Sequence, residues 1–230
     1  MSLMPITPCR LEGYRVSPAL IERVRSGSWN PDEEKGDREH RNALAARGYW
    51  QAYQAVRKSI DAVLRGNGSG AVADDHHRTW YQELFAPGVT AGLLRPADLA
   101  GYRNAPVHIR QSMHVPPRPE AVRDAMPAFF DLLHEEKEAS IRVVLGHFIF
   151  VYIHPYVDGN GCMGRYLMNV MLASGGYPWT VIPLGERDTY MAVLEHASVG
   201  QNIEPFADLL AGLVDAGLKG KPAPALPPSN

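Results

Sequence analysis

Apolar residues recur along most of this chain at the three- and four-residue steps of an amphipathic helix. The pattern predicts helices over residues 37–64, 120–134, 140–153, 164–173, 187–196 and 205–218. The segment 140–153 is apolar on every face, which predicts a central, buried helix.

Only one short region has the alternation of a β-structure. Residues 107–110 and 113–115 alternate around a short polar turn, and the pattern stops at Pro116 and Pro117. We therefore predict one small β-hairpin on a mainly α body.

Composition and charge narrow the class of protein. Of the 230 residues, 45% are hydrophobic and 21% are charged, close to the average of soluble globular proteins. The net charge of −2 gives no overall attraction to nucleic acid or to an anionic membrane. The longest near-continuous apolar stretch, residues 143–153, is about half of the ~20 residues that a membrane span needs. We expect neither kind of partner.

The cysteines and the N-terminus favour a reducing compartment. Cys9 and Cys162 lie far apart in the sequence, which excludes a disulfide framework and a zinc knuckle. The first residues lack the apolar core of a signal peptide. The expected location is the cytoplasm.

The breaks between helical patterns suggest three parts. Residues 1–75 form an N-terminal helical region, residues 76–218 a core domain, and residues 219–230 a Pro-rich tail that we expect to be disordered. Within the first part, residues 66–70 (GNGSG) are interpreted as a flexible loop.

The densest group of polar residues follows the most apolar helix, at residues 154–165 (HPYVDGNGCMGR). Pro155 cannot continue the helix, so His154 stands at the end of a rigid element, as suits a general base. Gly159 and Gly161 allow close backbone approach, and the chain re-enters a helix at about residue 161 or 162. A glycine loop before a helix N-terminus is a typical phosphate site.

Two charged residues fit the same chemistry. Asp158 could hold Mg²⁺, which binds through one or two carboxylates together with phosphate oxygens. Arg165, about one turn into the helix, could reach back to a phosphate. Each feature alone has a structural explanation, because DGNG is most often a turn and a histidine at a helix end is most often structural. Their grouping within twelve positions favours a phosphate-handling site.

Residues 154–165 resemble the Fic-domain signature HPFx(D/E)GNGRxxR, with Tyr156 in place of its Phe. Further segments with similar spacings follow the same family order, at 101–103, 107–122, 148–154, 168–178 and 186–190. The resemblance covers residues 80–215 and implies a Fic-type helical bundle in which the hairpin is a flap.

The resemblance also implies an activity, the transfer of AMP from ATP to a hydroxyl side chain of a target protein. It does not identify that target protein. By this resemblance His154 is the general base and Asp158 binds Mg²⁺. The phosphates are bound by Gly159, Asn160, Gly161 and Arg165, and Tyr190 lines the pocket of the adenine base. It places Val107, His108, Ile109 and His114 in the flap, which would align the target by strand addition. A homodimer is left open.

One position departs from the family pattern. Cys162 stands where the family has its first motif arginine, a phosphate ligand. Loss of a charged hydrogen bond costs about 1.5–3 kcal/mol. Three readings stay open: a weakened adenylyltransferase, a transferase with another phosphate-containing donor, and a binding module that transfers nothing.

A second family feature lies near the N-terminus. Residues 8–13 are similar to the inhibitory helix (S/T)xxxE(G/N) of many Fic proteins, although Pro8 replaces the Ser or Thr. The resemblance implies that Glu12 competes with ATP for Arg165.

Overall fold

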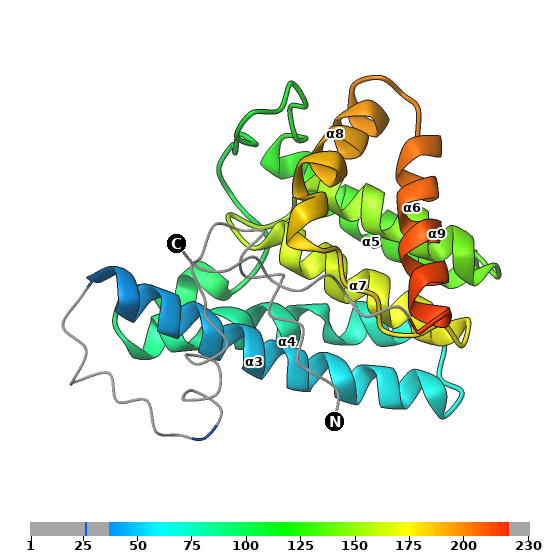
Figure 1. Cartoon of the computed structure of the whole chain (residues 1–230). Helices are drawn as coiled ribbons and strands as arrows, with labels where there is room; N and C mark the ends of the chain where they lie inside the picture. Colours follow the sequence, from blue (N-terminus) through cyan, green and yellow to red (C-terminus); the bar gives the residue numbers. More distant parts are fainter. Residues whose placement is uncertain (1–25, 27–36, 221–230) are drawn as a thin grey trace.

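The computed structural model describes residue 26 and residues 37–220 (Figure 1). Its elements are α3 (Asp37–Leu64), α4 (Ser69–Thr90), the short 3-10 helix η1 (Pro96–Leu99), α5 (Pro119–Glu135), α6 (Ala139–Ile153), α7 (Asn160–Ser174), η2 (Leu184–Glu186), α8 (Arg187–Ser198) and α9 (Glu204–Leu218). Glu12, the segment 8–13 and the tail from residue 221 lie outside the described residues.

The helix α4 has no counterpart in the sequence prediction. Several of its buried positions hold small or polar residues, among them Ser69, Gly70, Ala73 and His77. Hydrophobic periodicity therefore fails to show its inner face. The glycine-rich loop is shorter than expected, since α4 already begins at Ser69, and α4 runs through the proposed boundary at residue 75.

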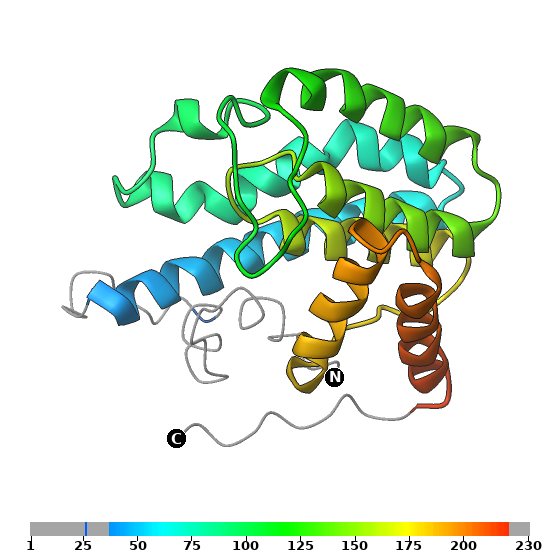
Figure 2. The same ribbon diagram turned by 90° about the horizontal axis from the view of Figure 1, so that it is seen from above.

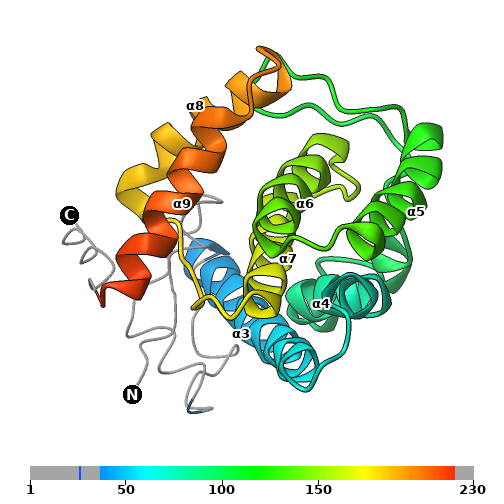
Figure 3. The ribbon, with the colours of Figure 1, turned by 90° about the vertical axis from the view of Figure 1, so that its right-hand side faces the viewer.

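The most completely buried helix is α7, and the expectation that residues 140–153 are buried on every face is wrong. In α7 every residue from Cys162 to Ala173 is buried, and Figure 3 shows α6 and α7 surrounded by the other helices. In α6, Ile141 and Leu145 are 40% exposed and Tyr152 is 39% exposed. Because α6 carries apolar residues on its outer face as well, its composition overstates its burial.

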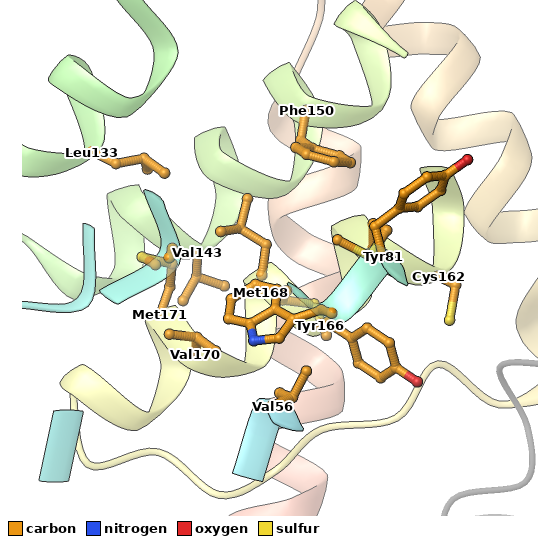
Figure 4. Packing of buried hydrophobic residues seen from close by; sticks show 14 of the residues in the cluster. Val56, Tyr81, Leu133, Val143, Phe150, Cys162, Tyr166, Met168, Val170 and Met171 are labelled. Atoms are coloured by element: carbon orange, nitrogen blue, oxygen red, sulfur yellow. The ribbon is translucent and has the colours of Figure 1, made fainter. Parts of the chain in front are cut away.

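Hydrophobic residues from several helices meet around α7. Figure 4 shows Met168 and Tyr166 of α7 together with Val56 of α3 and Phe150 of α6, with Cys162 at one edge of the cluster. None of the described helices is long and apolar enough to cross a membrane.

The expected hairpin does not form strands, and residues 37–220 contain no strand at all. Residues 107–117 form a loop, which we call the flap loop, with one turn closed by the Ser112 N–H donating to the Ile109 carbonyl (3.2 Å). The Met113 and His114 amides donate to side chains instead of to a facing strand. The mainly α fold is confirmed, and the paired β-structure within it is not.

The first two described helices, α3 and α4, touch backbone to backbone. A Cβ atom on Gly48 would lie 1.9 Å from the Leu84 carbonyl oxygen. No side chain fits there unless one helix moves. In contrast, Gly212 of α9 has no atom within 4 Å of the place of a Cβ.

Replacing Gly48 by alanine should therefore lower the free energy of unfolding by about 1–3 kcal/mol, because the core is overpacked. The matched substitution Gly212→Ala should raise it by up to ~1 kcal/mol through helix propensity. Urea denaturation of both variants measures the difference. Equal stabilities would contradict the close packing of α3 on α4.

Candidate active site

His154 follows the last residue of α6 in an unusual backbone conformation. Its φ of 52° and ψ of 59° lie in the left-handed region, which is uncommon for a residue other than glycine. The Nδ1 atom lies 3.2 Å from the Val151 carbonyl oxygen. Because a carbonyl only accepts, Nδ1 is the donor in this contact, and in the neutral ring the lone pair lies on Nε2. The imidazole is thus oriented as a base through Nε2.

Arg103, which is 2% exposed, fixes this end of α6. Its guanidinium donates to the carbonyl oxygens of His154 (2.7 Å), Ala105 (3.1 Å), Ile153 (3.4 Å) and Pro117. Its backbone N–H donates to the Pro155 carbonyl (2.8 Å). The last carbonyls of α6 and the base of the flap loop therefore share one buried cation, which compensates the left-handed turn at His154.

The Asn160 side chain closes the loop between α6 and α7. Its Oδ1 accepts from the Tyr156 N–H and its Nδ2 donates to the Tyr156 carbonyl, both at 2.8 Å. The Tyr156 ring is 2% exposed and stacks on Tyr81 with 3.7 Å between centroids. The Asn160 amide is therefore engaged inside the loop through Oδ1 and one N–H of Nδ2. Its second Nδ2 N–H and its backbone N–H are the donors left for a phosphate, and the expectation that Asn160 binds one stays a prediction.

The N-terminus of α7 opens from this closed loop. Gly159 has a φ of 76°, a conformation that favours glycine. A Cβ there would also lie 2.9 Å from a Phe85 ring carbon, so the packing favours glycine as well. The first intrahelical bond runs from the Met163 N–H to the Gly159 carbonyl (2.9 Å). The N–H groups of Asn160, Gly161 and Cys162 precede it and carry the positive end of the helix dipole. This is the geometry of an anion site.

Asp158 lies at the mouth of this site. It is exposed, and its Oδ1 accepts from the Gly159 N–H (2.7 Å), which orients the carboxylate. Burial and the Asp158 charge raise the pKa of the neighbouring Tyr81 to about 12. The Tyr81 hydroxyl therefore stays protonated and neutral at ordinary pH, next to the Asp158 carboxylate.

A cavity of about 230 Å³ adjoins the start of α7. Its described lining consists of Arg41, Leu44, Ala45, Leu84, Phe85, Gly88, Leu93, Leu94, Asp158, Gly159 and Cys162. Cys162, 3% exposed, contributes a small apolar surface where the signature has a guanidinium. Arg41 is the one basic residue among these lining residues.

Side chains hold the flap loop, which leads into α5 (Figure 2), at two places. The His114 ring is 9% exposed, and its Nε2 donates to the Tyr152 carbonyl of α6 (2.9 Å). At the tip, the Glu195 carboxylate of α8 accepts from the Ser112 hydroxyl and from the Met113 N–H (2.7 Å).

The other predicted flap residues take no part in these contacts. His108 is exposed, while Val107 and Ile109 are half-buried.

Two further predicted site residues are buried. Arg165 is 4% exposed within α7. Tyr190 is 3% exposed, and its hydroxyl lies 2.8 Å from Nε2 of His147 in the core. In this position the Tyr190 hydroxyl is turned toward His147, and the prediction that Tyr190 lines the pocket of the nucleotide base stays a prediction.

Comparison with known proteins agrees with this geometry. Residues 72–172 match the model of the Fic/DOC family. Residues 72–172 are therefore similar to a Fic/DOC domain. Two proteins named protein adenylyltransferase Fic are similar to it: that of Drosophila willistoni is 35% identical over 131 residues, and that of Nematostella vectensis is 36% identical over 124 residues. These matches cover 55% and 52% of this chain but only 26% and 28% of the relatives.

Solved structures show the same fold. C. elegans Fic-1 has a TM-score of 0.70 at 21% identity and covers 94% of this chain, which in turn covers 60% of that chain. A Fic domain containing signaling protein from Bacteroides thetaiotaomicron has a TM-score of 0.73 at 17% identity, with 93% and 82% covered.

Several residues that shape this site cannot be assigned roles from the sequence. Glu195 occupies an ordinary position on an amphipathic helix, and nothing in the pattern connects it with residues 112–113. His147 stands within an apolar run and resembles any core residue. Arg103 was noted only as part of a resembling segment. Their roles depend on long-range contacts that a single sequence does not display.

The buried His147 makes the stability of the domain depend on pH. Burial, and secondly the Arg165 charge, lower the pKa of His147 to about 3, against 6.5 for a histidine in water. Above pH 6.5 both folded and unfolded states hold the ring neutral. Below it the unfolded chain binds a proton that the folded domain does not, so the free energy of unfolding falls by up to ~1.4 kcal/mol per pH unit until about pH 3.

We expect His147→Gln to show a shallower loss of stability than the unchanged protein between pH 6.5 and 4.5. Urea denaturation at several pH values measures both slopes, and contributions from the carboxylates cancel in the comparison. Identical slopes would show that His147 takes up its proton as readily in the folded domain as in the unfolded chain.

Proposed function

We propose that this Fic/DOC domain transfers AMP from ATP to a hydroxyl side chain of a target protein. One observation carries the proposal: a closed loop of seven residues joins the oriented imidazole of His154 to the first N–H groups of α7. A base and an anion site so joined suit the attack of a hydroxyl on a phosphate. The names of the similar proteins support the same reaction.

The reaction requires one proton transfer and one exchange at phosphorus. The target hydroxyl oxygen attacks the α-phosphorus of ATP while His154 accepts its proton at Nε2. The bond from the α-phosphorus to the oxygen that bridges to the β-phosphorus breaks, and pyrophosphate leaves. The N–H groups of Gly161 and Cys162 are placed to stabilise charge on the phosphate oxygens.

The residues at the loop mouth fit Mg²⁺. Asp158 is exposed and has only Oδ1 engaged with a backbone N–H, so Oδ2 is available as a ligand. The described part of the chain contains no group of three or more His, Cys, Asp or Glu residues that could together hold a metal ion. Mg²⁺ needs no such group, because it commonly binds through one carboxylate, water and substrate phosphates. When bound, it would supply charge neutralisation of those phosphates.

We keep autoinhibition by Glu12 as part of the proposal. Arg165 is buried, three positions after Cys162. By the resemblance, it is the residue that the outermost phosphate of ATP would contact. A carboxylate brought to Arg165 would compete with that phosphate. Glu12 itself lies outside the described residues, so a variant must test this point.

The target and the setting are proposed from the same resemblance. The flap loop, with Met113 80% exposed and Val115 72% exposed, is the surface where a target segment would lie. We propose the cytoplasm as the location. A homodimer stays open.

The central prediction concerns His154. Glu12→Gly incubated with Mg²⁺ and ATP should gain the mass of one AMP, and Glu12→Gly/His154→Ala should lose this activity by about 10²–10⁴-fold, because the general base is missing. Intact-protein mass spectrometry, with a hydroxyl-bearing peptide library as second acceptor, measures both. Transfer at an unchanged rate without His154 would refute the mechanism.

The same assay tests Glu12. The Glu12→Gly protein should react faster than the unchanged one. Asp32→Gly, which removes another acidic residue of the N-terminal region, is the control and should react as the unchanged protein does. If Glu12→Gly and Asp32→Gly react at the same rate as the unchanged protein, Glu12 is no inhibitor.

A specific observation, the buried Cys162, keeps a second function in view, a Fic-fold module that binds nucleotide or protein without transfer. Cys162→Arg distinguishes the readings by returning the guanidinium of the signature. A weakened adenylyltransferase should gain about 10-fold or more in AMP transfer, the value of a charged hydrogen bond. No gain in AMP transfer would favour another donor or a binding role.

A further inference from the structure

The end of the bundle opposite to the candidate active site has a second cavity, of about 380 Å³. It is lined by Val63, Gly66, Asn67, Gly68, Ser69, Gly70, Ala71, Leu133, His134, Glu136, Arg142 and Ser174. Ser174 is the last residue of α7, whereas Gly159 and Cys162 line the first cavity at the other end of that helix. The 15 residues of α7 put roughly 20 Å between the two.

The N-terminus of α4 opens into this cavity. The preceding residue, Gly68, offers no side-chain cap, and the first helical bond runs from the Val72 N–H to the Gly68 carbonyl (3.0 Å). The N–H groups of Ser69, Gly70 and Ala71 therefore precede the helical bonds of a 22-residue helix. The glycine-rich stretch GNGSG thus stands before a helix start in the same way as DGNG does before α7.

Glycine is required at this helix start. A Cβ on Gly70 would lie 2.6 Å from the Leu133 carbonyl oxygen and 2.8 Å from Cδ2 of His134. The backbone of α4 is therefore pressed against the end of α5, and the His134 ring lies beside this helix start.

Two polar side chains at the cavity have hydrogen-bonding capacity that the protein does not use. Ser69 is only 5% exposed, and its hydroxyl makes no hydrogen bond with any described residue. Arg142 donates through one terminal nitrogen to the Glu136 carbonyl and through the other to the Ser174 hydroxyl (2.9 Å). Its Nε is buried without a partner. Because this Nε has almost no accessible surface, the donors of Arg142 that a ligand could use are the second N–H groups of its two terminal nitrogens.

The chemistry of these groups selects the ligand. Backbone N–H groups, a serine hydroxyl and a guanidinium are all donors to anions, and a guanidinium matches phosphate geometry. The Glu136 carboxylate also lines the cavity, but its Oε1 accepts from the Glu138 N–H (2.8 Å) and is directed to its own loop. The volume lies within the ordinary range of small-molecule sites.

We propose that this cavity binds the phosphate group of a small molecule, either inorganic phosphate or a nucleoside monophosphate. The α4 N–H groups and the Ser69 hydroxyl donate to the phosphate oxygens, and Arg142 supplies the positive charge. The site is independent of the AMP transfer proposed above, because none of its residues belongs to the loop 154–160.

Residue-specific NMR tests the proposal on the whole ¹⁵N-labelled chain. Inorganic phosphate is titrated at constant ionic strength, with chloride as the reference anion, and AMP is titrated separately. The Gly70 and Ala71 amide signals should move saturably with phosphate or AMP but not with chloride. Tighter binding of AMP than of phosphate assigns the nucleotide as the source, and equal or weaker binding assigns the free anion.

Three variants complete the test. Arg142→Gln should weaken binding at Gly70 by about 10- to 100-fold, and Ser69→Ala, which removes only the hydroxyl, by a few-fold to about 10-fold. Arg123→Gln, an exposed arginine of α5, is the matched control and should bind as the unchanged protein does. If the Gly70 and Ala71 signals do not saturate, or Ser69→Ala and Arg142→Gln both bind as Arg123→Gln does, the proposal is wrong.

Discussion

The closure of the loop between α6 and α7 is the constraint on which the candidate site depends. The Asn160 amide satisfies both polar backbone groups of Tyr156, and the buried Arg103 guanidinium gathers the carbonyls on the other side of that loop. Without them, the left-handed His154 would lose its compensating contacts. The imidazole and the α7 N-terminus keep a fixed relation because two side chains, one neutral and one charged, hold the backbone between them.

The fold supplies the rigid frame for this loop. Helix α7 is buried from Cys162 to Ala173 and cannot shift without disturbing the core. The N–H groups at its N-terminus are therefore held in a fixed position relative to the core. Gly159 is pressed against Phe85 of α4, which connects the anion site with the α3–α4 pair. Each end of α7 meets a cavity beside a glycine-led helix start. The two cavities differ in their basic residues, Arg41 at one and Arg142 at the other.

Much of this arrangement could be predicted from the sequence, and the failures have physical causes. The bounds of α3 and the position of the loop 154–160 follow from periodicity and from Pro155, both local signals. Hydrophobic periodicity does not predict helix α4, because its buried face holds Gly70 and His77. The flap loop forms no strands because its backbone amides donate to side chains. The Asn160–Tyr156 pair and the Glu195 contact need coordinates, since no spacing rule indicates them.

The most direct test of the account is a crystal structure of the protein with Mg²⁺ and a non-hydrolysable ATP analogue. We predict phosphates against the N–H groups of Gly161 and Cys162, the metal at Asp158, and the Asn160–Tyr156 pair unchanged from its present geometry. Phosphates bound away from the start of α7, or an Asn160 side chain released from Tyr156 to contact them, would contradict a preformed site.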